Sequence, residues 1–147
     1  MAHIQEICNK EGRIFSINFS EVKGVTKKAI KKARLVENFG IEQDAHSGPG
    51  LRQVSLLSIE SIRKQGECSM VRKKNITLIP GDFAENITTE GLNLARLKIG
   101  DRLKVGKSAI VEISKIGKEC HKHCTIYYKV GDCIMPREGI FAMVLSS

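Results

Sequence analysis

Short apolar runs separated by turn-forming residues constrain the fold of this chain more than any other feature. The core must be built mostly from Ile, Val and Leu, because the chain has five Phe, two Tyr and no Trp. These aliphatic residues suit pleated strands, and 13 glycines supply tight turns between the runs. The runs that we interpret as strands span residues 12–19, 33–39, 52–57, 75–79, 86–89, 102–105, 109–113 and 140–145. We therefore predict a mainly β fold, a barrel or a sandwich with a few short helices.

One segment carries clear helix signals. Ser58 is a suitable N-cap, Glu60 lies in the first turn and Gly66 can end the helix, so a short helix is predicted over residues 59–65. A second short helix is expected near residues 124–129. Helices are therefore additions to the sheet rather than a layer of their own.

Length and charge narrow the class of protein. A chain of 147 residues with no repeat or linker is the size of one domain, so residues 1–147 are expected to form a single domain. The net charge of +8, from 24 Lys and Arg against 16 Asp and Glu, favours anionic partners. Aromatic stacking platforms are scarce, so nucleic acid is not an expected partner.

The sequence also bears on the compartment. No apolar run approaches the length of a membrane span, and no apolar segment follows a basic start as in a signal peptide. We expect a cytoplasmic protein without membrane contact. The five cysteines are then interpreted as thiols and not as a disulfide framework.

The densest cluster of reactive side chains lies in residues 117–124, which contain two Cys, two His and two Lys. Cys120 is the leading candidate for chemistry, because Lys118 and His121 flank it and cationic neighbours favour the thiolate. The thiolate is both the nucleophile and the soft-metal ligand. The alternative is a surface or core cysteine without a role, since free cysteine often behaves as a small apolar residue.

Zinc is a second use for the same region. Cys120, Cys124 and Cys133, with the neighbouring histidines, would supply enough ligands for a tetrahedral site. The spacing contains no Cys-x-x-Cys pair, which argues against a zinc knuckle. A small zinc-stabilised interaction module using these three cysteines remains the alternative function.

Polar residues in a glycine-rich loop form another candidate site. Asp44 and His46 are close to Arg52 in sequence, and together they could bind an anion or act in acid–base chemistry. The alternative is a loop His that only bonds its neighbours. Arg137, after Pro136, could bind a phosphate with both guanidinium edges, or be an ordinary surface residue.

Two further segments have polar or basic side chains that could face a ligand. Asn86 and Thr88 follow the turn at residues 80–82 and could hold either a loop or a polar ligand. The lysine-rich run over residues 23–34, which includes Lys27, is either a solvated hairpin face or the wall of an anion pocket.

Seven segments in order resemble the MOSC domain, the molybdenum cofactor sulfurase C-terminal domain, in its small stand-alone bacterial form. The matching segments are residues 23–27, 44–46, 52–57, 80–88, 97–101, 117–121 and 133–142. The resemblance implies a β-barrel-like fold and a function in binding a molybdenum or tungsten pterin cofactor or in carrying sulfur toward it. It places the characteristic cysteine of the family at Cys120, as a metal-ligating or sulfur-bearing thiol.

The resemblance also implies the other residues of the site. The basic side chains would receive the pterin phosphate, and the histidines would orient the ligand or move protons. The expected cofactor-binding residues are Lys27, Asp44, His46, Arg52, Asn86, Thr88, Lys118, His121 and Arg137. The chain departs from the family pattern where Gln43 replaces a frequent Gly, where Gly50 and Leu51 replace a Trp or His, and where Met143 replaces an Arg.

Partners follow from the same resemblance. Larger relatives carry a pyridoxal-phosphate desulfurase domain that makes the persulfide, and a chain of 147 residues has no room for one. We expect no pyridoxal phosphate site here and a separate cysteine desulfurase as sulfur donor. The other expected partners are molybdenum cofactor biosynthesis proteins or molybdoenzymes. Whether the chain turns over as an enzyme stays open.

Overall fold

The computed structural model describes residues 3–6, 11–22, 25–66, 77–117 and 139–146. The cysteine-rich cluster and the helix expected near residues 124–129 lie outside the described residues.

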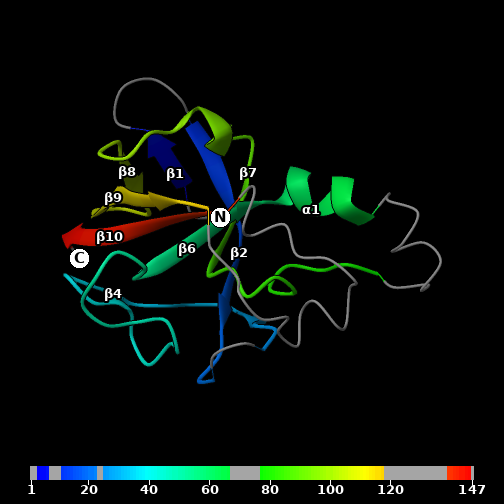
Figure 1. The fold of residues 1–147 in the computed structure, drawn as a ribbon, viewed down its shortest axis with the longest axis horizontal. Coiled ribbons are helices and arrows are strands. Elements are labelled where there is room, and N and C mark those ends of the chain that lie inside the picture. Colours follow the sequence, from blue (N-terminus) through cyan, green and yellow to red (C-terminus); the bar gives the residue numbers. More distant parts are fainter. Residues whose placement is uncertain (1–2, 7–10, 23–24, 67–76, 118–138, 147) are drawn as a thin grey trace.

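Strands dominate the described part of the chain (Figure 1). In chain order the elements are β1 (His3–Glu6), β2 (Glu11–Phe19), β3 (Lys28–Ile30), β4 (Leu35–Val36), β5 (Gly40–Ile41), β6 (Val54–Ser58), α1 (Ile59–Gly66), β7 (Ile87–Glu90), the 3-10 helix η1 (Leu94–Arg96), β8 (Arg102–Val105), β9 (Ala109–Ile116) and β10 (Ile140–Ser146).

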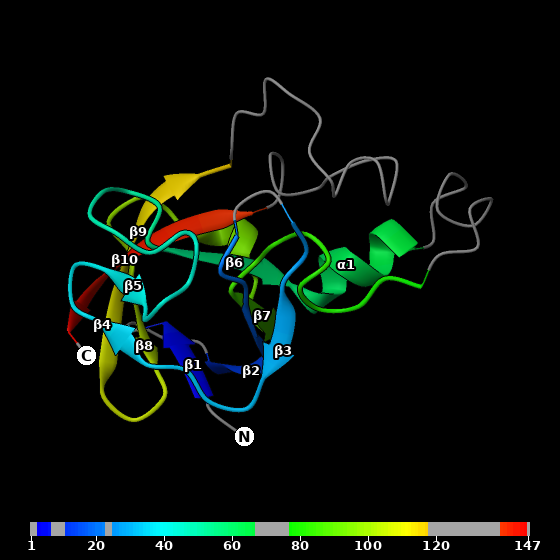
Figure 2. The same ribbon diagram turned by 90° about the horizontal axis from the view of Figure 1, so that it is seen from below.

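Eight of the strands form one curled sheet in the order β1-β8-β9-β10-β6-β7-β2-β3. An additional antiparallel pairing of β1 with β2 joins the two sides of this sheet, so seven strands close on themselves and β3 extends beyond β2. The β6–β7 pair is parallel, whereas the other pairs of the sheet are antiparallel. Figure 2 shows the small β4–β5 hairpin beside this barrel. The predicted mainly β, barrel-like class is confirmed.

The core lies inside the curled sheet and is aliphatic. Its buried members are Ile14, Val54, Leu56, Ile87, Leu92, Leu94, Leu97, Leu103, Val105, Val111, Ile113, Ile140, Ala142 and Val144. Alternating residues of β10 and β6 point into this interior, as the period of two in a strand requires. Ser55 lies between Val54 and Leu56 of β6 and therefore faces the other side of the sheet, where β2, β6 and β7 carry the site described below.

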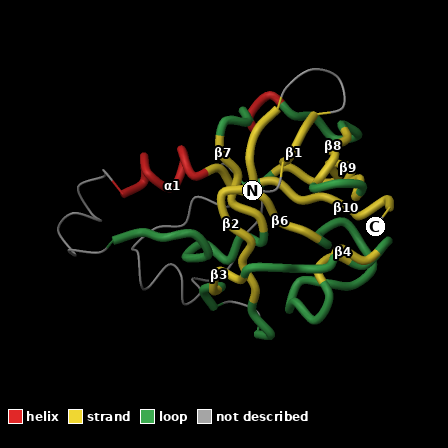
Figure 3. Tube along the Cα trace, turned by 180° about the vertical axis from the view of Figure 1, so that it is seen from behind, coloured by secondary structure: helices red, strands yellow, loops and turns green. Residues whose placement is uncertain are grey.

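Most of the expected elements are present. The hairpin of residues 102–105 and 109–113 is confirmed as β8 and β9. The helix is confirmed as α1, and the Ser58 Oγ caps it by accepting a hydrogen bond from the Ser61 N–H at 3.0 Å. Figure 3, seen from behind, shows how α1 projects away from the sheet.

Two strand predictions are wrong. Residues 33–39 do not form one strand, because Asn38 adopts a left-handed backbone conformation with φ of 53° and turns the chain between β4 and β5. Of the strand expected at 75–79, the described residues 77–79 are irregular. The short strands β1 and β3 were not expected, since three or four residues leave too little alternation to detect.

Gln53 connects three parts of the fold from a fully buried position. Its Oε1 accepts a hydrogen bond from the Val144 N–H at 2.9 Å, and its Nε2 donates to Asn38 Oδ1 and to the Gly50 carbonyl. The side chain thus links β6 to β10 and to the β4–β5 turn.

Replacing Gln53 by Met should lower the free energy of unfolding by about 1–3 kcal/mol, because the Val144 N–H loses a buried acceptor while the volume is nearly conserved. Urea denaturation measures the difference. The matched control is Gln43→Met at an exposed position, which should change stability by less than about 0.5 kcal/mol. Equal effects at the two positions would contradict this role.

Candidate functional site

Asp44 is the centre of a buried polar cluster on the outer face of the sheet. Its side chain is inaccessible to solvent, and Oδ1 accepts hydrogen bonds from Lys27 Nζ at 2.8 Å and from the Ser20 N–H at 3.2 Å. Oδ2 accepts from the His46 N–H at 3.0 Å. Lys27 Nζ also donates to Ser20 Oγ at 3.1 Å. Segments that lie far apart in the sequence are therefore joined at one carboxylate.

The electrostatics of this cluster keep Asp44 ionised. Burial raises the pKa of the carboxyl group, but hydrogen bonds from Lys27, from the His46 backbone and from the Asn86 side chain outweigh it and hold the pKa below the ordinary value. The result is a charge pair between Lys27 and Asp44 whose two side chains are completely removed from solvent.

His46 lies at the accessible edge of the cluster. Its Nδ1 is 3.8 Å from Asp44 Oδ2, and its side chain is 18% exposed. The backbone of the loop is fixed at this point, because the neighbouring Ala45 N–H donates to the Ser20 carbonyl. An imidazole that lies beside a carboxylate and is partly open to solvent can orient a ligand or exchange a proton.

Asn86 ties the cluster to the sheet. Its Oδ1 accepts hydrogen bonds from the Ser55 N–H at 3.0 Å and from Ser55 Oγ at 3.1 Å. Its backbone carbonyl accepts from the Asn18 N–H at 2.7 Å, and its Nδ2 lies 3.4 Å from the Asn18 carbonyl. Asn86 therefore bridges β6 and β2 beside Asp44.

Thr88 belongs to a neighbouring buried network. Its Oγ1 accepts from Asn18 Nδ2 at 2.9 Å and donates to Glu85 Oε2 at 2.7 Å. The Glu85 carboxylate also accepts from the backbone N–H groups of Gly81 at 2.9 Å and Phe83 at 3.2 Å. Thr88 is fully buried, so it holds the loop at residues 80–86 in this structure.

That loop packs directly on the chain at Lys27. Gly81 has a φ of 92°, a conformation that suits glycine, and a Cβ at this position would collide with the Lys27 carbonyl. The Gly81 carbonyl accepts a hydrogen bond from the Lys27 N–H at 2.7 Å. Glu85, by holding the Gly81 turn, thereby helps to position Lys27.

Glu85 gives a testable pH dependence. Burial raises its pKa, and the hydrogen bonds from Gly81, Thr88 and Phe83 offset this only in part. Because the native-state pKa is raised, the native protein binds more protons than the unfolded chain between pH 4.5, the ordinary value of the group, and its raised pKa. As the pH rises from 4.5 through the raised pKa, we expect the free energy of unfolding to fall in the wild type and to fall less in Glu85→Gln. Urea denaturation from about pH 4 to 8 measures it; parallel curves would contradict the assignment.

The remaining predicted site residues are placed as follows. Arg52 is exposed, and its guanidinium carbon lies 5.6 Å from the centroid of the Phe141 ring. The lysine run is divided, since Lys27 is buried whereas its other basic members in the described ranges are exposed: Lys28, Lys31, Lys32 and Arg34. Four predicted residues lie outside the described residues: Lys118, Cys120, His121 and Arg137.

Sequence reasoning missed several members of the cluster. Ser20, Asn18, Ser55 and Glu85 belong to no recognisable motif in the sequence, and only the pairing of β2 with β7 and of β6 with β7 brings their segments together. At one departure from the family pattern, Gln43 adopts a left-handed backbone conformation with a φ of 66°. This conformation suits the glycine that the pattern prefers at that position.

Neither a metal-binding cluster nor a membrane-spanning helix occurs in the described part of the chain. No group of three or more His, Cys, Asp or Glu side chains within residues 3–6, 11–22, 25–66, 77–117 and 139–146 is arranged to hold a metal ion. None of the helices described is long and apolar enough to cross a membrane.

Comparison with known proteins identifies the family. The model of the MOSC domain matches residues 42–135, which include Asp44, His46 and Asn86. The chain belongs to the MOSC domain family. No curated protein sequence matches it.

Solved structures share the fold. The YUAD protein from Bacillus subtilis superposes with a TM-score of 0.67 at 17% sequence identity, over 98% of this chain and 88% of that protein. YiiM from Geobacillus stearothermophilus gives 0.65 at 21% identity, over 90% and 67%. YiiM from Escherichia coli gives 0.65 at 15% identity, and this chain, 99% of which is covered, spans 63% of that protein.

Proposed function

We propose that this protein binds a molybdenum or tungsten pterin cofactor, or carries sulfur toward it, with Cys120 as the metal ligand or the persulfide carrier. The observation that carries the proposal is the meeting of four motif residues from three distant segments, Lys27, Asp44, His46 and Asn86, in one hydrogen-bonded cluster. These segments are among those by which the chain resembles the family, and the MOSC domain is associated with molybdenum cofactor sulfurase.

The side chains of the cluster suit an anionic pterin. Lys27 and Asp44 neutralise each other, so the buried carboxylate does not present an uncompensated negative charge to an anion. Lys27 is a positioning residue in this scheme, because its ammonium group is buried against Asp44 and Ser20. His46 and the exposed Arg52 are the groups that would contact the ligand, with Arg52 suited to a phosphate. When bound, the cofactor would supply a metal centre that accepts a thiolate or sulfur ligand.

The sulfur-carrying role uses only the chain and a donor. The Cys120 thiolate attacks the terminal sulfur of a persulfide on a separate cysteine desulfurase. The sulfur–sulfur bond of the donor breaks, a new bond forms between Cys120 Sγ and the transferred sulfur, and the donor leaves as a thiolate. Lys118 and His121 would stabilise the attacking thiolate. The sulfur or the cofactor would then pass to a molybdoenzyme in the cytoplasm.

Metal and pterin analysis tests the proposal. Protein purified from a molybdate-fed host should contain molybdenum or tungsten together with a releasable fluorescent pterin, or a persulfide that cyanide removes. One zinc per chain without pterin or persulfide would instead support the zinc-stabilised module of Cys120, Cys124 and Cys133.

The exposed lysines should act through charge alone. Replacing Lys28, Lys31 and Lys32 together by Gln should weaken binding of the anionic pterin about tenfold at low salt and flatten its salt dependence, with about 0.5 kcal/mol from each charge. Isothermal titration at two salt concentrations measures it. The control replaces three exposed lysines elsewhere, Lys98, Lys104 and Lys107, by Gln. Equal losses in both triple variants would mean that only net charge matters.

A further inference from the structure

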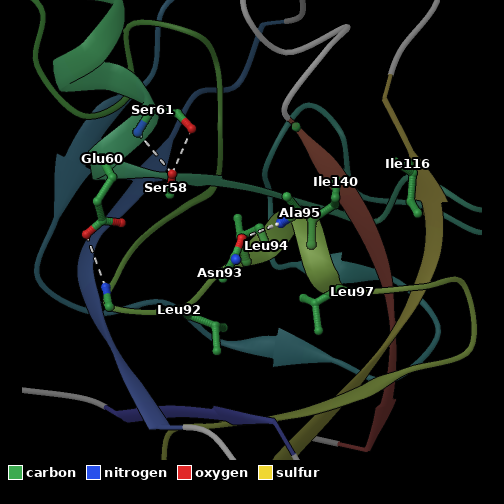
Figure 4. Close-up of a pocket in the computed structure, with 12 residues that line it drawn as sticks. Ser58, Glu60, Ser61, Leu92, Asn93, Leu94, Ala95, Leu97, Ile116 and Ile140 are labelled. Carbon is green, nitrogen blue, oxygen red and sulfur yellow. Dashed lines mark hydrogen bonds between the residues drawn. The ribbon is translucent and has the colours of Figure 1, made fainter.

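A cavity of about 510 Å³ lies at the barrel and is lined by none of the residues of the cluster at Asp44. It lies between the start of α1, the segment that leads into η1, and the adjoining ends of β9 and β10 (Figure 4). Its volume falls within the range of small-molecule sites, roughly 300–1,000 Å³. None of its lining residues takes part in the hydrogen bonds described around Asp44 and Glu85.

The floor of the cavity is apolar. Leu92, Leu94, Leu97 and Ile140 line it, and each belongs to the buried core. Ile116, which is 50% exposed, forms part of the rim. In Figure 4 the leucines of the η1 segment and Ile140 lie around one space. An apolar body that enters it would exchange water for aliphatic contacts.

The polar groups gather on one side, at the start of α1. Ser58, Glu60 and Ser61 line the cavity there, and Ser58 Oγ donates to Ser61 Oγ at 2.9 Å. Glu60 Oε2 accepts a hydrogen bond from the Gly91 N–H at 3.1 Å, which holds the carboxylate beside the cavity. Its second oxygen is an acceptor that this bond does not use.

The charge of the lining sets the class of ligand. Among the described residues that line the cavity, Glu60 is the one ionisable side chain, although the whole chain has a net charge of +8. The Glu60 carboxylate repels an anionic head group and attracts a cationic one. The cavity therefore favours a ligand with a cationic or neutral head group, whereas the proposed pterin site favours an anion.

We propose that this cavity is a second binding site, specific for a compact amphiphile with an apolar body and an amine or hydroxyl head. The body lies against Leu92, Leu94 and Ile140, and the head donates hydrogen bonds to Glu60 and to the serines at the start of α1. None of the residues that line the cavity belongs to the Asp44 cluster.

Three probes of similar size and different charge test the proposal: 2-phenylethylamine, 2-phenylethanol and phenylacetate. Methyl NMR of Leu92, Leu94, Leu97 and Ile140 should show shifts with the amine at a Kd of roughly 1 mM or tighter, weaker shifts with the alcohol, and at least about tenfold weaker binding of phenylacetate. This readout does not depend on cofactor, so it is unaffected if the proposed function fails.

Variants make the test specific. Glu60→Gln keeps an acceptor for the Gly91 N–H but removes the charge, so the amine and the alcohol should then bind within about twofold of each other. Glu42→Gln, at an exposed carboxylate that does not line the cavity, is the matched control and should leave the preference unchanged. Absence of methyl shifts with all three probes, or equal binding of the amine and phenylacetate to the wild type, overturns the proposal.

Discussion

Replacing Cys120 by Ser is expected to weaken binding of the molybdenum cofactor, or retention of sulfane sulfur, by about a hundredfold or more, while the protein stays folded. The substitution removes the soft ligand and nucleophile but changes the side chain by one atom. An unperturbed cysteine with a pKa near about 8.5 is only a few per cent thiolate at pH 7. Lys118, His121 and Lys122 beside it should raise that share.

Two measurements check this expectation. Brief alkylation at neutral pH followed by mass spectrometry should label Cys120 first among the five cysteines. Metal, pterin and persulfide contents of the Cys120→Ser variant are then compared with those of Cys68→Ser, since Glu67 beside Cys68 disfavours its thiolate. Labelling of Cys120 last, or full retention of cofactor and sulfur by Cys120→Ser, would remove the central residue of the proposed function.

The fold was predictable where local signals were sufficient. The hairpin β8–β9 has apolar residues on alternate positions and a Gly-Lys turn between them, and α1 has a serine cap and a glycine end. The strand expected at residues 33–39 failed because Asn38 can adopt the left-handed conformation that turns the chain, and an apolar run does not reveal this. The pairing of β1 with β2 closes the barrel, and a strand as short as β1 is not predictable from its own sequence.

The site was predictable as a set of residues but not as a set of roles. Lys27 was expected to face an anion, and in the structure its ammonium group is buried against Asp44 and Ser20. Glu85 lies inside a segment that the sequence had singled out, yet a carboxylate held by backbone N–H groups of its own turn is visible only in three dimensions. Residue type and order identify a family motif, whereas burial decides which members contact a ligand.

The Lys27–Asp44 pair gives the largest expected effect on stability. Lys27→Met should lower the free energy of unfolding by about 3–5 kcal/mol, because it leaves the Asp44 carboxylate buried without its cation. A double variant, Lys27→Met with Asp44→Leu, should recover part of this loss, since an apolar pair of similar volume carries no uncompensated charge. Denaturant unfolding at pH 7 measures both.

The control is an ion pair at the surface. Arg102 and Glu112 approach to 3.4 Å with side chains that are 57% and 26% exposed, so Arg102→Met should cost no more than about 1 kcal/mol.

The pH dependence separates the two pairs further. Because the pKa of Asp44 is lowered in the native state, its contribution is complete above pH 3.8, the ordinary value, and is lost as the pH falls through the lowered pKa. In Lys27→Met the burial of Asp44 is no longer offset by the lysine, so its pKa rises and the carboxyl takes up a proton at a higher pH than in the wild type. The gap between wild type and Lys27→Met should therefore be largest at high pH and narrow as the pH falls. A gap at pH 7 no larger than that of Arg102→Met would show that the buried pair does not organise this site.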